Sequence, residues 1–170
     1  MSLILRHRPQ DFGVTLDAEG WTGVADLRAA LAARGVDLSH SELEALVSTN
    51  DKQRFALSPD GSRIRASQGH SVAVRLEYPP GDPPELLFHG TVARFLPSIR
   101  ASGLLPRQRQ HVHLSASREL AAAVGRRRGI PIVLEVLAGR MHDAGHVFVL
   151  SPNGVWLTGG VPPEFLVLPG

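Results

Sequence analysis

The chain has 170 residues, of which 43% are hydrophobic and 20% charged, the composition of an ordinary globular protein. It contains no cysteine, which excludes disulfides, thiolate metal sites and cysteine-dependent catalysis. The formal net charge is only +2, so the broad positive field of a protein that coats DNA nonspecifically is excluded as well.

Up to about residue 75 the hydrophobic pattern predicts three helices. The first is short, with Ser2 as its cap, and stops at Arg8-Pro9 because the residue before a proline is pushed out of the helical region. The second ends at Gly35, and the third begins at Ser39 or Ser41. The apolar residues at helical spacing are Val24, Leu27, Leu31 and Ala32 in the second helix, and Leu43, Leu46 and Val47 in the third.

A β-hairpin and a linker are expected next. Residues 54–57 and 62–66 alternate in polarity around the turn Ser58-Pro59-Asp60-Gly61, which predicts two antiparallel strands. Three helices followed by a two-stranded wing make a winged-helix layout. Residues 78–84 are rich in proline and predict a stiff linker that holds two lobes at a fixed spacing.

After the linker the pattern changes to short, mostly β-branched runs bounded by glycine or proline. Helices are expected at Ala93–Ser102 and Ser117–Arg127. Strands are expected at 86–89, 112–114, 130–136, 147–150, 155–157 and 165–168. The second lobe is therefore predicted to be α+β with a mostly antiparallel sheet.

Lone basic residues stand where these patterns start or stop. Arg6 and His7 end the first helix, Lys52 (the only lysine) and Arg54 lead into the hairpin, and Arg109 precedes a strand. Planar guanidiniums make paired, charge-assisted hydrogen bonds to phosphate oxygens, which favours a phosphate site. Each residue alone also has a plainer interpretation: a basic helix end that offsets the helix dipole, or a solvated edge where Lys52 and Arg54 share one face of an entering strand.

A second group of candidates follows the linker. His89-Gly90-Thr91 closes the first strand there, and it offers a close backbone approach and hydrogen-bonding groups for ribose hydroxyls. The plainer interpretation is a tight turn capped by threonine. A ligand site is favoured by the helix around Ser98, which breaks at Gly103 ahead of the strand with His113 and Ser115.

Histidines two apart on a strand, as at His111 and His113, also occur in zinc sites, with His89, His142 and His146 as further possible ligands. No catalytic zinc spacing is present and no acidic residue adjoins the pair. Contact with a ligand is therefore preferred to a structural pair or a metal site.

Residues 65–71 form a polar segment that leaves the hairpin. Alone it is a loop, but beside a basic cleft it could read RNA, since such side chains contact 2′-hydroxyls and phosphates. The candidates in it are Arg65, Gln68, His70 and Ser71. Arg126–Arg128 is interpreted as a solvated helix end.

Conventional catalytic motifs are absent from the sequence: there is no P-loop, no dinucleotide-binding glycine motif, no nucleophile elbow and no close carboxylate pair. A reaction would then depend on an electrophilic cosubstrate and on electrostatic stabilisation.

Together the motifs resemble the RNA 2′-phosphotransferase family of Tpt1/KptA type, which acts on NAD. Any one motif is weakly specific, but the ordered set covers nearly the whole chain. It comprises Leu5-Arg6-His7-Arg8-Pro9, Leu16-Asp17-x-x-Gly20-Trp21, Asp51-Lys52-x-Arg54-Phe55, Ile64-Arg65-Ala66-x-Gln68-Gly69-His70-Ser71, Leu87-Phe88-His89-Gly90-Thr91, Ile99-x-x-x-Gly103-Leu104 and Arg109-x-His111-Val112-His113-Leu114-Ser115. The family usually has more residues before the first motif, so the first helix is expected to be less well supported.

The resemblance implies an N-terminal winged-helix RNA-binding lobe over residues 1–77 and an NAD-binding lobe of ADP-ribosyltransferase type over residues 78–170. It implies NAD as cosubstrate, no metal, and RNA with an internal 2′-phosphate as partner. In the first step the 2′-phosphate attacks C1″ of the nicotinamide ribose and nicotinamide leaves. In the second, O2″ attacks the phosphorus of the RNA-phospho-ADP-ribose intermediate, which releases 2′-hydroxyl RNA and ADP-ribose 1″,2″-cyclic phosphate.

The resemblance also implies roles for individual residues. Catalysis is assigned to Arg6, His7, Arg54 and Arg109, with Lys52 near the same phosphate. The residues expected to line the NAD site are His89, Gly90, Thr91, Ser98, Gly103, His113 and Ser115.

Two other functions stay open on the sequence alone. One is NAD-dependent ADP-ribosylation of terminal nucleic-acid phosphates, which needs the same first step. The other is a non-enzymatic winged-helix regulator with a ligand-sensing second lobe. With no apolar run near 18 residues and no signal-peptide layout, a cytosolic monomer without membrane contact is expected.

Overall fold

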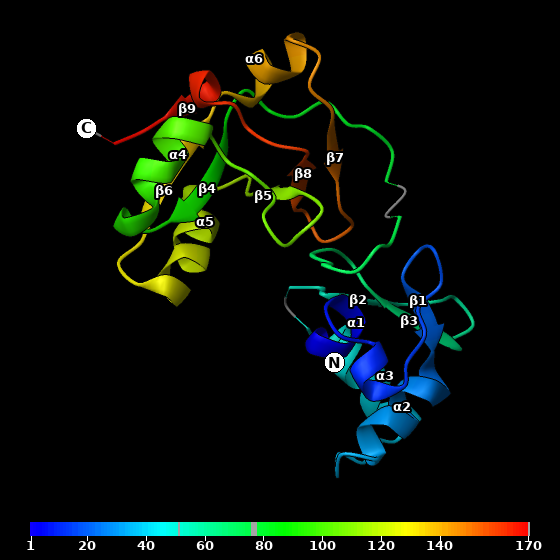
Figure 1. The fold of residues 1–170 in the computed structure, drawn as a ribbon. Coiled ribbons are helices and arrows are strands. Elements are labelled where there is room, and N and C mark those ends of the chain that lie inside the picture. Colours follow the sequence, from blue (N-terminus) through cyan, green and yellow to red (C-terminus); the bar gives the residue numbers. More distant parts are fainter. Residues whose placement is uncertain (51, 76–77, 170) are drawn as a thin grey trace. The chain divides into compact units, whose positions relative to one another are not determined.

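The computed structural model describes residues 1–50, 52–75 and 78–169, and the chain divides into two compact units, Met1–Glu77 and Tyr78–Gly170 (Figure 1). All strand pairs between the named strands are antiparallel. The α+β class predicted from the sequence is therefore confirmed. No helix among the described residues is long and apolar enough to span a bilayer.

The N-terminal unit combines short helices with one three-stranded sheet of order β1-β3-β2. Its elements are α1 (Ser2–Arg6), η1 (Gln10–Phe12), β1 (Trp21–Gly23), α2 (Val24–Ala32), α3 (His40–Ser48), β2 (Phe55–Leu57) and β3 (Arg63–Ala66). The predicted hairpin is present as β2 and β3, but β3 also pairs with β1 on its other edge. The sequence did not predict β1, because three residues are too few to show alternation.

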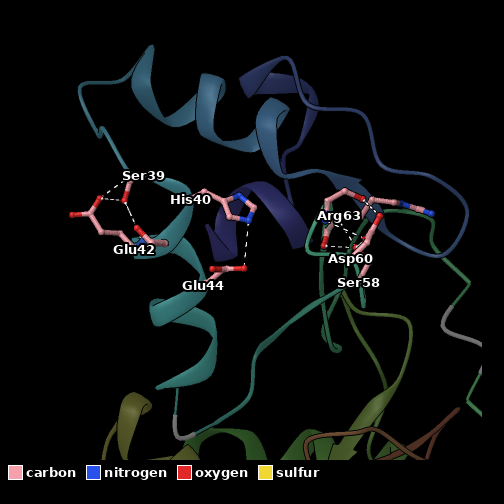
Figure 2. Close-up of polar contacts among 9 residues, drawn as sticks. Ser39, His40, Glu42, Glu44, Ser58, Asp60 and Arg63 are labelled. Carbon is pink, nitrogen blue, oxygen red and sulfur yellow. Dashed lines mark hydrogen bonds and ion pairs between the residues drawn. The ribbon is translucent and has the colours of Figure 1, made fainter.

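Helix ends of this unit follow local hydrogen-bond chemistry. Ser39 caps α3: its hydroxyl accepts from the Glu42 N–H, and the Glu42 carboxylate accepts from the Ser39 N–H (Figure 2). Gly35, at φ +77°, closes α2 with a bond to Ala32, while the next N–H reaches back to Leu31. The predicted cap at Ser2 is wrong, since Met1 occupies the cap position and no side-chain bond caps α1.

The hairpin turn is held by one carboxylate. Asp60 accepts hydrogen bonds from the hydroxyls of Ser58 and Ser62 at 2.5 and 2.7 Å, and Ser58 also accepts from the Arg63 N–H (Figure 2). The bonds from Ser58 and Ser62 lower the pKa of Asp60 to about 2. The turn that the sequence predicted is thereby locked in one geometry.

The core of the N-terminal unit lies where the helices meet the sheet. Ile4 and Leu5 are 2% and 0% exposed, so α1 is anchored in that core despite its expected weaker support. Leu43 is also fully buried, but Leu46 is 45% exposed. The expectation that Leu46 shares the buried face of α3 is therefore wrong.

The C-terminal unit has two three-stranded sheets, of order β4-β6-β9 and β5-β8-β7, instead of a single one. A bridge between Phe88 and Ser115 joins β4 to β5. The elements are β4 (Leu87–Thr91), η2 (Ala93–Phe95), α4 (Leu96–Ser102), β5 (Val112–Leu114), α5 (Arg118–Gly125), η3 (Arg126–Arg128), β6 (Ile132–Val136), α6 (Ala138–Asp143), β7 (Phe148–Leu150), β8 (Trp156–Thr158), η4 (Pro163–Phe165) and β9 (Leu166–Val167).

Two features of this unit differ from the sequence expectation. Helix α6 was not predicted, although its Ala138 and Met141 are fully buried. The proline-rich segment is not a free spacer: Pro80 forms a bridge with Val149, and the Gly81 N–H donates to the Phe148 carbonyl at 2.9 Å. This segment therefore packs along β7 as part of the C-terminal unit.

Candidate active site

Arg6 is the most enclosed cation of the N-terminal unit. It is the last residue of α1 and only 9% exposed. Its Nη2 donates to the Arg54 carbonyl at 3.2 Å, and its guanidinium carbon lies 5.9 Å from the centre of the Phe55 ring. These contacts hold a planar, permanently charged group in one orientation.

His7 follows Arg6 as the C-cap of α1 and is tied to the segment after β3. Its Nδ1 and the Ser71 hydroxyl share a hydrogen bond of 3.0 Å, and the Ser71 N–H donates to the Arg6 carbonyl at 2.8 Å. Residues 64 positions apart in the sequence thus fix the direction of the His7 ring.

Lys52 and Arg54 lie in a turn ahead of β2, so the prediction that they share one face of a strand is wrong. Gln53 between them has φ +39°, a left-handed conformation that breaks strand alternation. The hydroxyl of Ser67 donates to the Gln53 carbonyl at 2.7 Å, and the Ser67 N–H donates to the Arg54 carbonyl at 2.9 Å. The backbone beneath Arg54 is therefore fixed, whereas Lys52 is exposed.

Arg65 packs on an aromatic ring. It faces Trp21 across the β1–β3 pair, and its guanidinium carbon lies 4.5 Å from the Trp21 ring centre. Arg63 lies over the same ring at 5.4 Å and also pairs with Asp17. The predicted strip continues with the half-buried Gln68.

His70 is only 2% exposed, so it lies inside the N-terminal unit. Neither ring nitrogen has a hydrogen-bond partner within the described residues. Burial, followed by the charges of Arg6, His7 and Arg65, lowers the pKa of His70 to about 4. The ring is therefore neutral at neutral pH, which limits the positive charge packed around Arg6.

In the C-terminal unit His89 is positioned by the link between the two sheets. The bridge between Phe88 and Ser115 joins the sheets here, and Nδ1 of His89 lies 3.1 Å from the His113 carbonyl oxygen. Since a carbonyl only accepts, Nδ1 carries the proton and Nε2 presents a lone pair. Burial lowers the pKa of His89 further than the bond to His113 raises it, so a neutral acceptor is expected at neutral pH.

The two predicted ligand-binding glycines have structural reasons of their own. A Cβ on Gly90 would stand 1.8 Å from the Ala121 carbonyl oxygen of α5, and a Cβ on Gly103 would stand 2.0 Å from the Val161 carbonyl oxygen. Gly103 also has φ +70°. Both positions require glycine for packing, whatever ligand approaches them.

Other residues that were predicted to line the NAD site are buried or make hydrogen bonds within the C-terminal unit. Thr91 is 5% exposed, and the Ser98 hydroxyl donates to the Phe95 carbonyl at 2.9 Å. Ser115 exchanges two backbone hydrogen bonds of 2.9 Å with Phe88. His113 is half-buried on β5. These residues order the strand ends around His89.

Arg109 has neighbours that the sequence did not reveal. It is exposed, and desolvation, followed by the charges of Arg128 and Arg127, lowers its pKa. The charge of Arg128 also lowers the pKa of His89. The only sequence signal was the Arg126–Arg128 run, interpreted as a solvated helix end.

Two hollows of the C-terminal unit involve none of the residues predicted for catalysis, NAD or RNA, but His142 and His146, considered above as possible metal ligands, lie at them. One, of ≈ 170 Å³, lies around Asp82, His142 and His146, and another, of ≈ 580 Å³, lies around Leu105, Val147 and His146. In the described part of the chain, no three His, Cys, Asp or Glu side chains gather in a way that could hold a metal ion.

An α+β protein with arginines and neutral histidines gathered in each of its units fits the class of proteins that bind phosphate esters. The chain matches the family model described as RNA 2′-phosphotransferase, Tpt1 / KptA family, over residues 1–160. It therefore belongs to that family.

Curated relatives agree with this assignment. A "Probable RNA 2′-phosphotransferase" of Burkholderia lata is 56% identical over 98% of this chain and 86% of its own length. Proteins of the same name from Streptomyces griseus and Pseudomonas aeruginosa are 52% and 54% identical, over 100% and 98% of this chain and 94% and 92% of their own lengths. At this identity and coverage, the chain is an enzyme of the RNA 2′-phosphotransferase type.

Proposed function

We propose that the enzyme removes an internal 2′-monophosphate from RNA by transferring it to NAD, which gives 2′-hydroxyl RNA, nicotinamide and ADP-ribose 1″,2″-cyclic phosphate. The observation that carries the proposal is the buried Arg6, held by the Arg54 carbonyl beside His7, in a chain of this family. NAD enters the reaction as a substrate.

The first step needs positioning more than base catalysis. A phosphate monoester is already an anion near neutral pH, so one of its oxygens can attack C1″ of the ribose while the bond to nicotinamide breaks. We assign the phosphate to Arg6, His7, Arg54 and Arg109, with Lys52 supplying a further positive charge. Guanidiniums suit this task because their planar forks match phosphate oxygens.

In the second step O2″ attacks phosphorus and the bond from phosphorus to the RNA O2′ breaks. One proton leaves O2″ and one reaches O2′, so a side chain that can both accept and donate a proton is useful. His7 fits this role, since its ring is oriented by Ser71. The arginines stabilise the charge that builds up on the phosphate oxygens.

NAD is assigned to the C-terminal unit, as a lobe of ADP-ribosyltransferase type. The Nε2 lone pair of His89 suits a ribose hydroxyl, a fit that follows from the bond of Nδ1 to His113. Gly90, Thr91, Ser98, Gly103, His113 and Ser115 would shape the surrounding walls.

The N-terminal unit is proposed as a winged-helix RNA-binding lobe. Arg65, Gln68 and Ser71 would contact the strand, while the buried His70 supports Arg6 and His7 from behind. The helices followed by the β2–β3 hairpin support this assignment.

The deciding experiment incubates the purified protein with a short RNA that carries one internal 2′-phosphate, with and without NAD. Cyclic phosphate, nicotinamide and 2′-hydroxyl RNA, all dependent on NAD, are the expected products. A stable ADP-ribose cap on terminal phosphates, with the internal 2′-phosphate untouched, would contradict the proposal. So would tight RNA binding without any release of nicotinamide.

A further inference from the structure

Arg128 lies at the centre of a cationic group that the sequence did not connect. Its guanidinium carbon lies 5.8 Å from the centre of the Phe95 ring, and that of Arg94 lies 4.9 Å from the same centre. Its charge also reaches Arg109 and His89. We call Arg94, Arg109, Arg127 and Arg128 the Phe95 arginine cluster.

Close backbone packing brings the cluster together. Helix α5 lies directly on β4 because Gly90 and Gly125 have no side chains: a Cβ on Gly125 would stand 3.0 Å from the Thr91 carbonyl oxygen. The η3 turn continues α5 and therefore ends beside β4. This delivers Arg127 and Arg128 to the end of the strand that carries His89.

The cluster has no internal counter-charge. Arg8, Arg63 and Arg118 each pair with a carboxylate, but within residues 78–169 no arginine of the cluster does. All four side chains are exposed. Arg94 and Arg128 lie over one ring, and the charges of Arg127 and Arg128 act on Arg109. These like charges repel each other, and a bound polyanion would relieve that repulsion.

We propose that the Phe95 arginine cluster binds backbone phosphates of the RNA strand that carries the 2′-phosphate, with Phe95, which packs against the core, holding Arg94 and Arg128 in place. This rests on the proposed function for the identity of the RNA. Exposed guanidiniums gathered on one surface suit the phosphates along a single strand. The pyrophosphate of NAD carries two negative charges, fewer than four arginines would neutralise.

The cluster would favour internal over terminal 2′-phosphates. A 2′-phosphate within a strand has a phosphodiester on the neighbouring 3′ carbon, whereas one at a 3′ end has a hydroxyl there. With Arg109 on the transferred phosphate, Arg128, whose charge acts on Arg109, is available for that phosphodiester. The preference follows from one additional charge-assisted contact.

The test compares the Arg94→Ala/Arg128→Ala double variant with Arg100→Ala/Arg140→Ala, which removes two exposed arginines outside the cluster. Binding of unmodified single-stranded RNA is measured by fluorescence anisotropy over a range of salt. The cluster variant should bind about tenfold more weakly, with a salt slope lower by about 1 to 1.5, as expected for two lost phosphate contacts. The control variant should keep both values near wild type.

Kinetics identify which substrate the cluster holds. In the cluster variant the KM for a 2′-phosphorylated oligonucleotide should rise about tenfold and the KM for NAD by less than about twofold. A rise in the KM for NAD with RNA binding intact overturns the proposal, as do unchanged values for both. If the wild-type protein released no nicotinamide, the proposed function would fail, while the RNA-binding comparison would still decide the role of the cluster.

Discussion

The two units hold their cations in opposite ways. Arg6 is 9% exposed and bonded to the Arg54 carbonyl, whereas Arg109 and Arg128 are exposed and meet other arginines. A buried, bonded guanidinium is fixed before a ligand arrives, which suits the stabilisation of a transition state. An exposed group without a carboxylate instead needs the ligand to complete it. The N-terminal group therefore resembles a preformed site and the C-terminal group a docking surface.

The largest effect is expected where the C-terminal group depends on close packing. Gly90→Ala forces a methyl to within 1.8 Å of the Ala121 carbonyl oxygen, so the unit should lose at least about 3 kcal/mol of unfolding free energy. Gly159→Ala is the matched control, since nothing lies within 4 Å of the added methyl. Urea unfolding of the full chain measures both. Equal midpoints for the two variants would contradict the packing argument.

Next come the arginines that are proposed to bind the transferred phosphate. Arg54→Ala and Arg109→Ala should each lower the rate by at least about two orders of magnitude, as loss of a group that stabilises charge in the transition state commonly does. Lys52→Ala should cost less, because this amine is exposed in a turn. Arg100→Ala, outside both groups, is the control.

These rates are measured as nicotinamide release in single turnovers, alongside a thermal melt of each variant. Near-normal rates in a folded Arg54 or Arg109 variant would remove that residue from the site.

The contrast in burial also predicts a pH dependence of stability. The folded chain keeps His70 neutral down to its pKa of about 4, while the unfolded chain protonates this residue near pH 6.5. Stability should therefore fall by roughly 2 to 3 kcal/mol between pH 6.5 and pH 4 and then level off for this group.

His70→Gln should flatten that fall, and His40→Gln, which alters an exposed histidine on α3, should leave it in place. Urea unfolding at several pH values makes the comparison. If the unfolding free energy of His70→Gln fell with pH as that of the wild type does between pH 6.5 and pH 4, the lowered pKa of His70 would be contradicted.

The smallest effect concerns a helix cap in the N-terminal unit. Ser39→Ala removes the hydroxyl that accepts from the Glu42 N–H and should cost about 1 kcal/mol. Ser41→Ala, two residues into the same helix, should cost less. The difference between their thermal midpoints checks the prediction, and a larger loss for Ser41→Ala would refute it.

Much of the local structure was predictable because it depends on neighbouring residues. The capping box at Ser39, the glycine that closes α2 and the turn around Asp60 each follow from hydrogen bonds within a few positions. The hairpin and most strands of the C-terminal unit followed from their alternating or β-branched runs. Elements with weak patterns, β1 and α6, were missed.

The geometry of the candidate site could not be predicted from the sequence. Motif order pointed to Arg6, His7, Arg54 and Arg109 as catalytic residues, and this assignment stays a prediction. Nothing in the motifs indicated that Lys52 and Arg54 lie in a turn with a left-handed residue between them, or that His70 is buried. The grouping of Arg128 with Arg94 was equally hidden, since 33 intervening residues carry no signal of it.

By itself the sequence determined the fold class, the ends of α2 and α3, the hairpin turn, and the chemistry available to the site, because side-chain identity and local hydrogen bonding decide these. Tertiary structure alone decided which cations are buried and which gather in the open. Whether a cation is buried or exposed depends on contacts between segments that are distant in the sequence. Examples are the packing of α5 against Gly90 of β4 and the hydrogen bond from Ser71 to the Arg6 carbonyl at the end of α1. Such contacts arise from packing and long-range hydrogen bonds, which no single stretch of sequence contains.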